Sequence, residues 1–268
     1  MRQRGHPDNS ATIRRQRLGL FVLAIATLST AWVLPSPARA DEYKIYSPLV
    51  VKGENEFEFR AYDAQDSSPQ LNGDQQYRVS YERGLTNNWV TEVYAVMANP
   101  PGGNFHTHNI ELENRFQLTP MGKYWATLGL YQALEIPTRA GIPYSLELMP
   151  LIQVQSGRRL AIANLDFERN FGTNREHGTI FSYRLLLEYK LYQAFSPALE
   201  FHGEPGPLGS FHPLDGQDHE IGPAIYGVSY FRNYQTINYS TALLFGVTRA
   251  SPDVRIVFRF AYEFFTFD

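Results

Sequence analysis

The sequence has no cysteine, so disulfide bonds cannot stabilise it, and burial and backbone hydrogen bonding must hold the fold together. Beyond residue 34 there is no run of 18 apolar residues, which excludes a membrane-spanning helix from that part of the chain. Three catalytic patterns are also missing: the Gly-x-Ser-x-Gly nucleophile turn, the His-Glu-x-x-His metal pair and the phosphate-binding glycine loop. We therefore predict no enzyme activity, no catalytic residue, no cofactor and no bound metal.

The first 40 residues have the layout of a secretory signal peptide. Five arginines lie within the first 17 residues, an apolar stretch runs from Leu18 to Leu34, and two prolines precede the small-residue site Ala38-Arg39-Ala40. We predict cleavage after Ala40 and a periplasmic N-terminal segment over residues 41–53. The alternative is an uncleaved anchor helix, because about 17 apolar residues lie at the lower limit for crossing a bilayer.

Removal of the signal peptide makes the remaining chain clearly acidic. The signal holds six of the 24 Lys and Arg residues but only one of the 27 Asp and Glu residues, which leaves a net charge of about −8. Nucleic acid is excluded as a partner, because phosphate binding needs a clustered basic surface and the sequence has none. The remaining length, about 228 residues, fits a single domain or barrel.

From residue 54 onward the dominant pattern is alternation of apolar and polar side chains, which is typical of β-strands. In the last such segment Phe258 and Phe260 fall on an apolar, aromatic face, whereas Arg255, Arg259 and Glu263 fall on the opposite face. The pattern predicts an all-β fold without amphipathic helices. The twelve predicted strands are 54–62, 75–84, 89–98, 107–118, 125–136, 144–154, 160–170, 179–190, 197–204, 218–229, 237–247 and 254–265.

The connections between these strands alternate in length, which favours an antiparallel up-and-down transmembrane β-barrel over residues 54–268. Those at 63–74, 99–106, 137–143, 171–178 and 205–217 are longer and rich in turn residues, whereas the others are tighter. Alternation alone also fits a soluble barrel or sandwich. The export signal, the 14% aromatic content and the unequal loops favour lipid on the apolar face, so we predict outer-membrane lipid as a partner.

The chain ends on an aromatic strand, Phe264-Phe265-Thr266-Phe267-Asp268. This ending resembles the signal by which outer-membrane barrels engage the barrel-assembly machinery, although that signal places an aromatic residue at the last position and this chain has Asp268 there. We therefore predict the barrel-assembly machinery as a second partner and the outer membrane of a Gram-negative bacterium as the location.

If the apolar faces meet lipid, the charged faces line the lumen. One interpretation is that the acidic and basic groups pair across a narrow interior and stabilise it. The other is a passage for small solutes, mildly selective for cations because Glu exceeds Arg. The predicted lumen-lining residues are Glu56, Glu58, Arg60, Arg78, Glu82, Glu92, Glu111, Glu113, Arg115, Glu135, Glu147, Arg184, Glu188, Arg255, Arg259 and Glu263.

Histidines form two further groups. His106 and His108 lie on a predicted loop, where alternate residues face the same side and could present two imidazoles to one metal ion. His202, His212 and His219 flank a long Gly- and Pro-rich stretch that could bind a cation or fold inward as a plug. Chance loop histidines and a turn-rich external loop explain these groups more simply, so we assign no metal site.

Several stretches resemble a broad group of proteobacterial outer-membrane β-barrels described as porin-like or transporter-like, with members linked to phenol-degradation pathways. They are VKGENEFEFR from residue 51, YERGLTNNWVTEVYA from residue 81, EIGPAIYG from residue 220 and LLFGVTRASPDVRIVFRFAYEF from residue 243. The resemblance covers most of the chain after the signal peptide. It implies an outer-membrane location and transport, but no particular solute.

The leading functional hypothesis from the sequence is a monomeric barrel of about twelve strands that acts as a porin-like channel or transporter for small solutes. The first alternative is a plugged barrel with a structural or adhesive role in the envelope. A third, less favoured, is an outer-membrane hydrolase, for which the sequence shows no characteristic Ser and His spacing.

Overall fold

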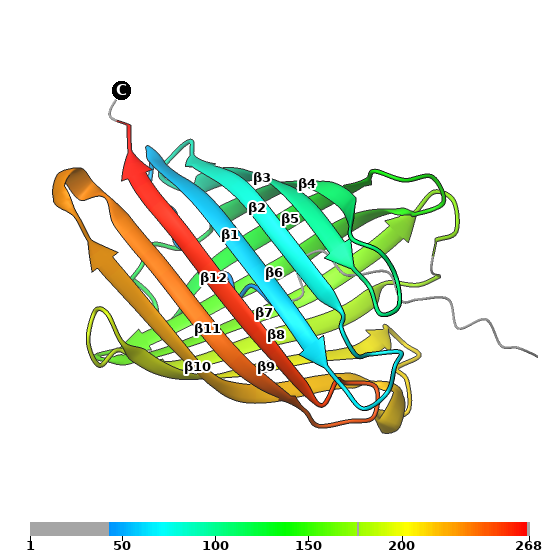
Figure 1. Cartoon of the computed structure of the whole chain (residues 1–268). Helices are drawn as coiled ribbons and strands as arrows, with labels where there is room; N and C mark the ends of the chain where they lie inside the picture. The colour runs from blue at the N-terminus through cyan, green and yellow to red at the C-terminus, as the bar shows by residue number, and fades with distance from the viewer. Residues whose placement is uncertain (1–42, 176, 267–268) are drawn as a thin grey trace, which may run out of the picture. The chain divides into compact units, whose positions relative to one another are not determined.

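The computed structural model describes residues 43–175 and 177–266. They form twelve antiparallel strands, each paired with its neighbours in sequence, and β1 pairs with β12 to close the barrel (Figure 1). The strands are β1 Glu54–Gln65, β2 Gln75–Gly84, β3 Trp89–Asn99, β4 His106–Gln117, β5 Thr127–Pro137, β6 Tyr144–Ser156, β7 Arg159–Phe171, β8 Ile180–Tyr189, β9 Ser196–Pro207, β10 Asp218–Tyr230, β11 Thr236–Gly246 and β12 Val254–Phe265. The predicted fold class is confirmed, and all twelve predicted strands are present.

Two short 3-10 helices, η1 Leu214–Gly216 and η2 Arg232–Tyr234, lie in connections between strands. No helix within the described residues has both the length and the apolar character needed to cross a membrane. The predicted signal peptide, residues 1–40, lies outside the described residues, as do Phe267 and Asp268 of the predicted assembly signal. Both remain predictions.

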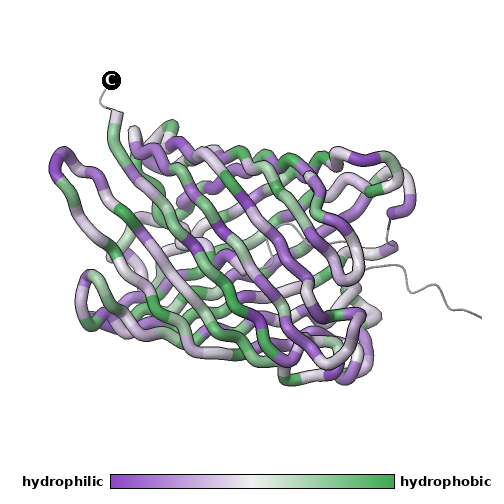
Figure 2. Tube along the Cα trace, viewed as in Figure 1, coloured by the Kyte–Doolittle hydropathy of each residue, from purple (hydrophilic) through white to green (hydrophobic). Residues whose placement is uncertain are grey.

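The barrel is built inside out relative to a soluble protein. Apolar and polar residues alternate along the strands (Figure 2), and the side chains that point outward are the apolar ones. Phe258 and Phe260 are 43% and 39% exposed, whereas Arg255 is 4% exposed. A soluble barrel would bury the phenylalanine rings and expose the arginine, because burial of apolar surface drives folding in water. The structure therefore supports lipid-facing strands.

The connections at the two ends of the barrel differ in length. The end that we call the loop rim carries the connections 66–74, 100–105, 138–143, 172–179, 208–217 and 247–253. The end that we call the turn rim carries 85–88, 118–126, 157–158, 190–195 and 231–235. This arrangement matches the expected alternation, with the exception of 118–126, which is longer than predicted.

The residues before β1 contact the barrel wall. The sequence predicts a periplasmic N-terminal segment over residues 41–53, and that location remains a prediction. In the structure residues 43–50, which we call the lumen segment, contact inward-facing side chains of the barrel wall, and Tyr43, Lys44 and Tyr46 are buried. The segment joins the turn rim where Gly53 donates a backbone hydrogen bond to Gly84 at the end of β2.

Candidate functional site: the lumen and the segment inside it

The structure places the predicted lumen-lining residues on the inward faces of the strands. Arg115, Glu135, Glu188, Arg259 and Glu263 are half-buried. The buried members are Glu56, Glu58, Arg60, Arg78, Glu82, Glu92, Glu111, Glu113, Glu147, Arg184 and Arg255. Sequence reasoning missed further inward carboxylates, namely Asp166, Glu168, Glu200 and Glu220. The acidic excess of the lumen is therefore larger than the sequence suggested.

The lumen segment pairs with no strand among the described residues, and side chains of the wall satisfy part of its backbone. The amide of Tyr46 donates to Asn164 Oδ1 at 2.7 Å, and Asn164 Nδ2 donates to the Tyr46 carbonyl at 3.0 Å. Arg115 Nη1 donates to the Ser47 carbonyl at 2.8 Å, and the amide of Val50 donates to Gln117 Oε1 at 3.0 Å. Buried backbone groups need such partners, and β4 and β7 supply them here.

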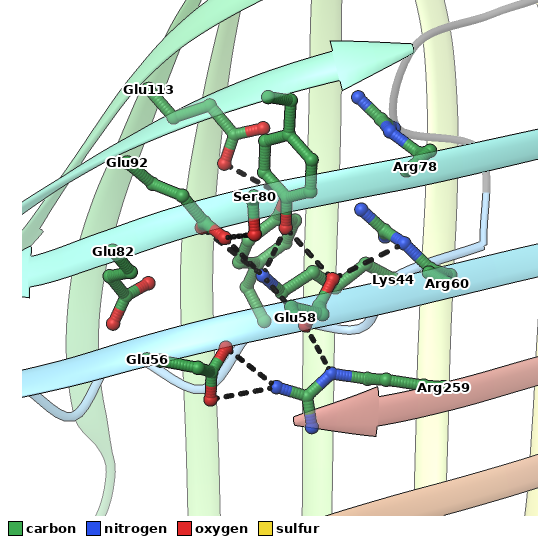
Figure 3. A network of polar contacts seen from close by, with 12 residues as sticks. Lys44, Glu56, Glu58, Arg60, Arg78, Ser80, Glu82, Glu92, Glu113 and Arg259 are labelled. Atoms are coloured by element: carbon green, nitrogen blue, oxygen red, sulfur yellow. Dashed lines mark hydrogen bonds and ion pairs between the residues drawn. The ribbon is translucent and has the colours of Figure 1, made fainter. Parts of the chain in front are cut away.

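Lys44 lies at the centre of the polar network in Figure 3. Its Nζ is 3.2 Å from Glu58 Oε2 and 3.2 Å from Glu92 Oε2, and it lies 2.6 Å from the hydroxyl oxygen of Tyr94. Tyr94 in turn donates to Glu58 Oε1 at 2.9 Å, and Ser80 Oγ donates to Glu92 Oε1 at 2.6 Å. An ammonium group has three donors, and two carboxylates and a phenol oxygen account for them. We call Glu58, Glu92 and Tyr94 the Lys44 cage.

Glu92 of the cage and two neighbouring carboxylates, those of Glu56 and Glu82, each offer an oxygen within 4.8 Å of the others. Such a group could hold a metal ion. Each of them, however, already has a cationic partner at 2.8–3.2 Å, so the network is balanced by the chain's own residues. The partners are Arg259, Arg115 and Lys44, respectively. We assign no metal site here.

A second contact of the lumen segment is apolar. Tyr46 is 2% exposed and its ring centroid lies 4.7 Å from that of Tyr131, in a buried cluster with Met149 and Leu151. The Tyr46 hydroxyl donates to Glu113 Oε2 at 3.0 Å. The inward face of β5 and β6 is therefore not uniformly polar, and it forms a dry surface against which the segment packs.

Tyr43 borders three free spaces within the lumen. A cavity of about 370 Å³ lies toward the turn rim, and cavities of about 30 Å³ and about 10 Å³ lie farther toward the loop rim. Tyr43 lines all three. Its hydroxyl donates to Glu220 Oε1 at 2.9 Å, and the Arg255 guanidinium lies 4.4 Å from its ring centroid, which holds the ring between the cavities.

The histidine groups do not converge on a metal geometry within the described residues. His106 begins β4 rather than lying in a loop, and its ring centroid is 5.8 Å from that of His108. His202 Nε2 is 2.9 Å from a carboxylate oxygen of Glu200, and the His219 ring is hydrogen-bonded to the side chains of Tyr183 and Gln217. His212 lies in the connection 208–217, where its backbone amide donates to the carbonyl of Pro205.

No model of a known protein family matches the sequence. No curated protein matches it either. Among solved structures, the chain is similar to the NanC porin in a rhombohedral crystal form, with a TM-score of 0.53 and 8% identity over 79% of this chain and 100% of that one. A KdgM porin in complex with disordered oligogalacturonate gives a TM-score of 0.49 at 8% identity over 80% and 99% of the two chains. At this identity the similarity to the NanC porin shows the fold alone, and that fold is a porin-like closed β-barrel.

Proposed function

We propose that the protein is an outer-membrane channel for small solutes and that it prefers cations. One observation carries the proposal: a closed barrel with apolar side chains outward encloses a lumen whose inward carboxylates outnumber its arginines. Hydrocarbon offers backbone groups no hydrogen-bond partner, so a closed barrel is the form in which strands cross a bilayer. Rings of carboxylates inside such a barrel favour cations over anions.

The 370 Å³ cavity at the turn rim supports small solutes as the cargo. Cavities of about 300–1,000 Å³ suit ligands of small-molecule size. Glu54, Glu56, Glu188, Glu200 and Glu263 all line it. Lys190 and Gln193 line its edge near the turn rim, so the charged surface continues to that end of the barrel.

Conductance in planar bilayers tests the proposal. The protein without residues 1–40 is refolded in detergent and inserted, and current is recorded in a gradient of potassium chloride. We expect discrete conductance steps and a reversal potential of the sign given by potassium selectivity. An anion-selective reversal potential would contradict the cation preference, and silence of every variant described below would contradict the channel itself.

The second candidate is a plugged barrel with a structural or adhesive role, which the lumen segment favours. The same recordings decide between the two, because a structural barrel conducts in neither the wild type nor a variant whose segment has been displaced. We propose no enzymatic role, and incubation of the refolded protein with phospholipid and lipopolysaccharide substrates tests that proposal.

We also propose export through a signal peptide cleaved after Ala40 and insertion by the barrel-assembly machinery. Cleavage there would start the mature chain at Asp41, two residues before Tyr43. N-terminal sequencing of the protein from an outer-membrane fraction would test the site. Recovery of an intact N-terminus would instead support the anchor helix.

A further inference from the structure

The polar contacts of the lumen segment are unevenly distributed. From Lys44 to Val50 they are to β1, β3, β4, β6 and β7, and Tyr46 also packs on Tyr131 of β5. Tyr43 contacts β10 and β12, and Ile45 packs against β7 and β8. The 370 Å³ cavity borders the segment on the side of β8 to β12. The twelve strands pair with one another without any contribution from the segment. Release of the segment would therefore break its side-chain contacts, including those of Tyr43 with β10 and β12, and would leave the strand pairing unchanged.

The wall also retains most of its polar partners when the segment leaves. Glu58 keeps Arg259 and Arg60, and Arg115 keeps Glu82. Glu92 is the exception among the cage carboxylates, because without Lys44 the hydrogen-bond donors that remain beside it are the neutral hydroxyls of Ser80 and Tyr94.

The segment is thus a separable element whose charged anchor is the ammonium of Lys44. Detachment exposes Glu92 to water and ions in the lumen and leaves the other ion pairs of the wall in place.

A glycine on β5 provides the room for the segment. A Cβ at Gly129 would lie 2.6 Å from Cβ of Pro48, which is closer than side-chain carbons approach. The backbone of Gly129 does not need a positive φ, so this close approach accounts for the absence of a side chain. A glycine in a strand interior often marks a place where another backbone passes.

We propose that the lumen segment is an autoinhibitory plug: attached to the barrel wall it blocks the lumen at Tyr43, and its release opens the channel. This inference rests on the proposed channel function. Release converts the separate cavities around Tyr43 into one passage and needs no change in strand pairing. Rearrangements of this kind, a tethered segment moving against a fixed frame, occur on the microsecond to second scale.

A reversible crosslink tests the plug directly. The chain has no cysteine, so Ser47→Cys together with Gln153→Cys introduces the only two thiols. Ser47 Oγ and Gln153 Oε1 are 2.8 Å apart, and because the glutamine side chain spans part of that gap, a short bifunctional methanethiosulfonate is used to join the thiols. We expect channel openings to disappear on crosslinking and to return when reductant cleaves the bridge. Each single variant treated with the same reagent is the control.

The opposite perturbation is Gly129→Val, which places methyl groups where Pro48 now lies. Overpacking strain of the usual size would raise the ratio of open to closed time by about 5- to 150-fold. Ala163→Val, on the outward side of β7, is the matched control and should leave that ratio unchanged. The heat-dependent electrophoretic shift of folded barrels checks that both variants have assembled.

The outcomes separate the two proposals. Conductance that persists unchanged in the crosslinked protein overturns the plug and leaves the channel standing. The channel function is overturned if no conductance is recorded for the wild type, the reduced double variant or assembled Gly129→Val. The plug's regulatory role then fails with it.

Discussion

Lys44→Met should detach the lumen segment without unfolding the barrel. The substitution keeps the length and apolar stem of the side chain and removes the ammonium that lies 3.2 Å from both Glu58 and Glu92. Glu58 retains its arginines, but Glu92 is left buried beside the neutral hydroxyls of Ser80 and Tyr94. Removal of one member of a buried ion pair costs about 3–5 kcal/mol, because the other charge remains without compensation.

The unpaired Glu92 carboxylate destabilises only the state in which the segment is attached, because water and ions reach it once the segment leaves. The substitution therefore lowers the free energy needed to release the segment and leaves the free energy of barrel unfolding unchanged. A cost at the lower end of the range, about 3 kcal/mol, corresponds to roughly a 100-fold shift toward the released state. The lower end applies because the neighbouring 370 Å³ cavity borders Lys44 and gives it access to solvent.

Hydrogen exchange of the Tyr46 amide measures this shift, because that amide donates to Asn164 at 2.7 Å and exchanges only when the segment opens. We expect its protection factor to fall about 100-fold in Lys44→Met, because a cost of about 3 kcal/mol shifts the equilibrium toward the released state by that factor. Lys52→Met removes the same charge from an exposed position of the same chain region and should change nothing. Lys44→Met combined with Glu92→Gln should recover part of the protection, since the uncompensated charge is gone.

Unchanged protection of Tyr46 in Lys44→Met would refute the reasoning. So would an equal loss in Lys52→Met, which would indicate a general effect of net charge.

Three further outcomes are expected. Tyr43→Ala should raise single-channel conductance while the lumen segment stays protected from exchange, because the ring that borders all three cavities is removed. An unchanged conductance would place the constriction elsewhere. Phe260→Lys, in the middle of an outward face, should cost about 2–4 kcal/mol of folding free energy in vesicles, because it places a charge in the lipid. Trp125→Lys in a turn should cost about 0–1 kcal/mol, and equal costs would argue against lipid on the apolar face. Glu188→Gln with Glu263→Gln should move the reversal potential in a salt gradient toward zero, since both carboxylates line the cavity at the turn rim.

The strands could be predicted because each repeats a local contrast that sheet geometry requires. In β12 the side chains of Phe258 and Phe260 alternate with Arg259, and the same residues point outward and inward in the structure. The contrast is weaker where the inward residues are themselves apolar, as with Leu160 and Ile162 on β7. For that reason Asp166 and Glu168 of the same strand were missed among the lumen carboxylates.

The lumen segment could not be predicted, because its contacts are long-range and it has no periodicity. Tyr46 and Asn164, for example, are 118 residues apart, and no pattern in either stretch indicates the other. Two signals were present in the sequence. One is Gly129 in the interior of a strand, and the other is Lys44 among aromatic residues directly before the barrel. Neither identifies its partner without the fold.

The apolar inward face of β5 to β7 bears on which state of the lumen predominates. Tyr131, Met149 and Leu151 have no exposed surface although they point into a space that is otherwise lined with charge. In a permanently open aqueous pore these side chains would be wetted, and burial of apolar surface contributes about 25 cal/mol per Å² to keeping them covered. The lumen segment covers them through Tyr46. The apolar surface and the Lys44 cage thus stabilise the same attached state of the lumen segment. If the segment acts as the proposed plug, the blocked lumen is the resting state, and the free energy of these two contacts sets how often the channel opens.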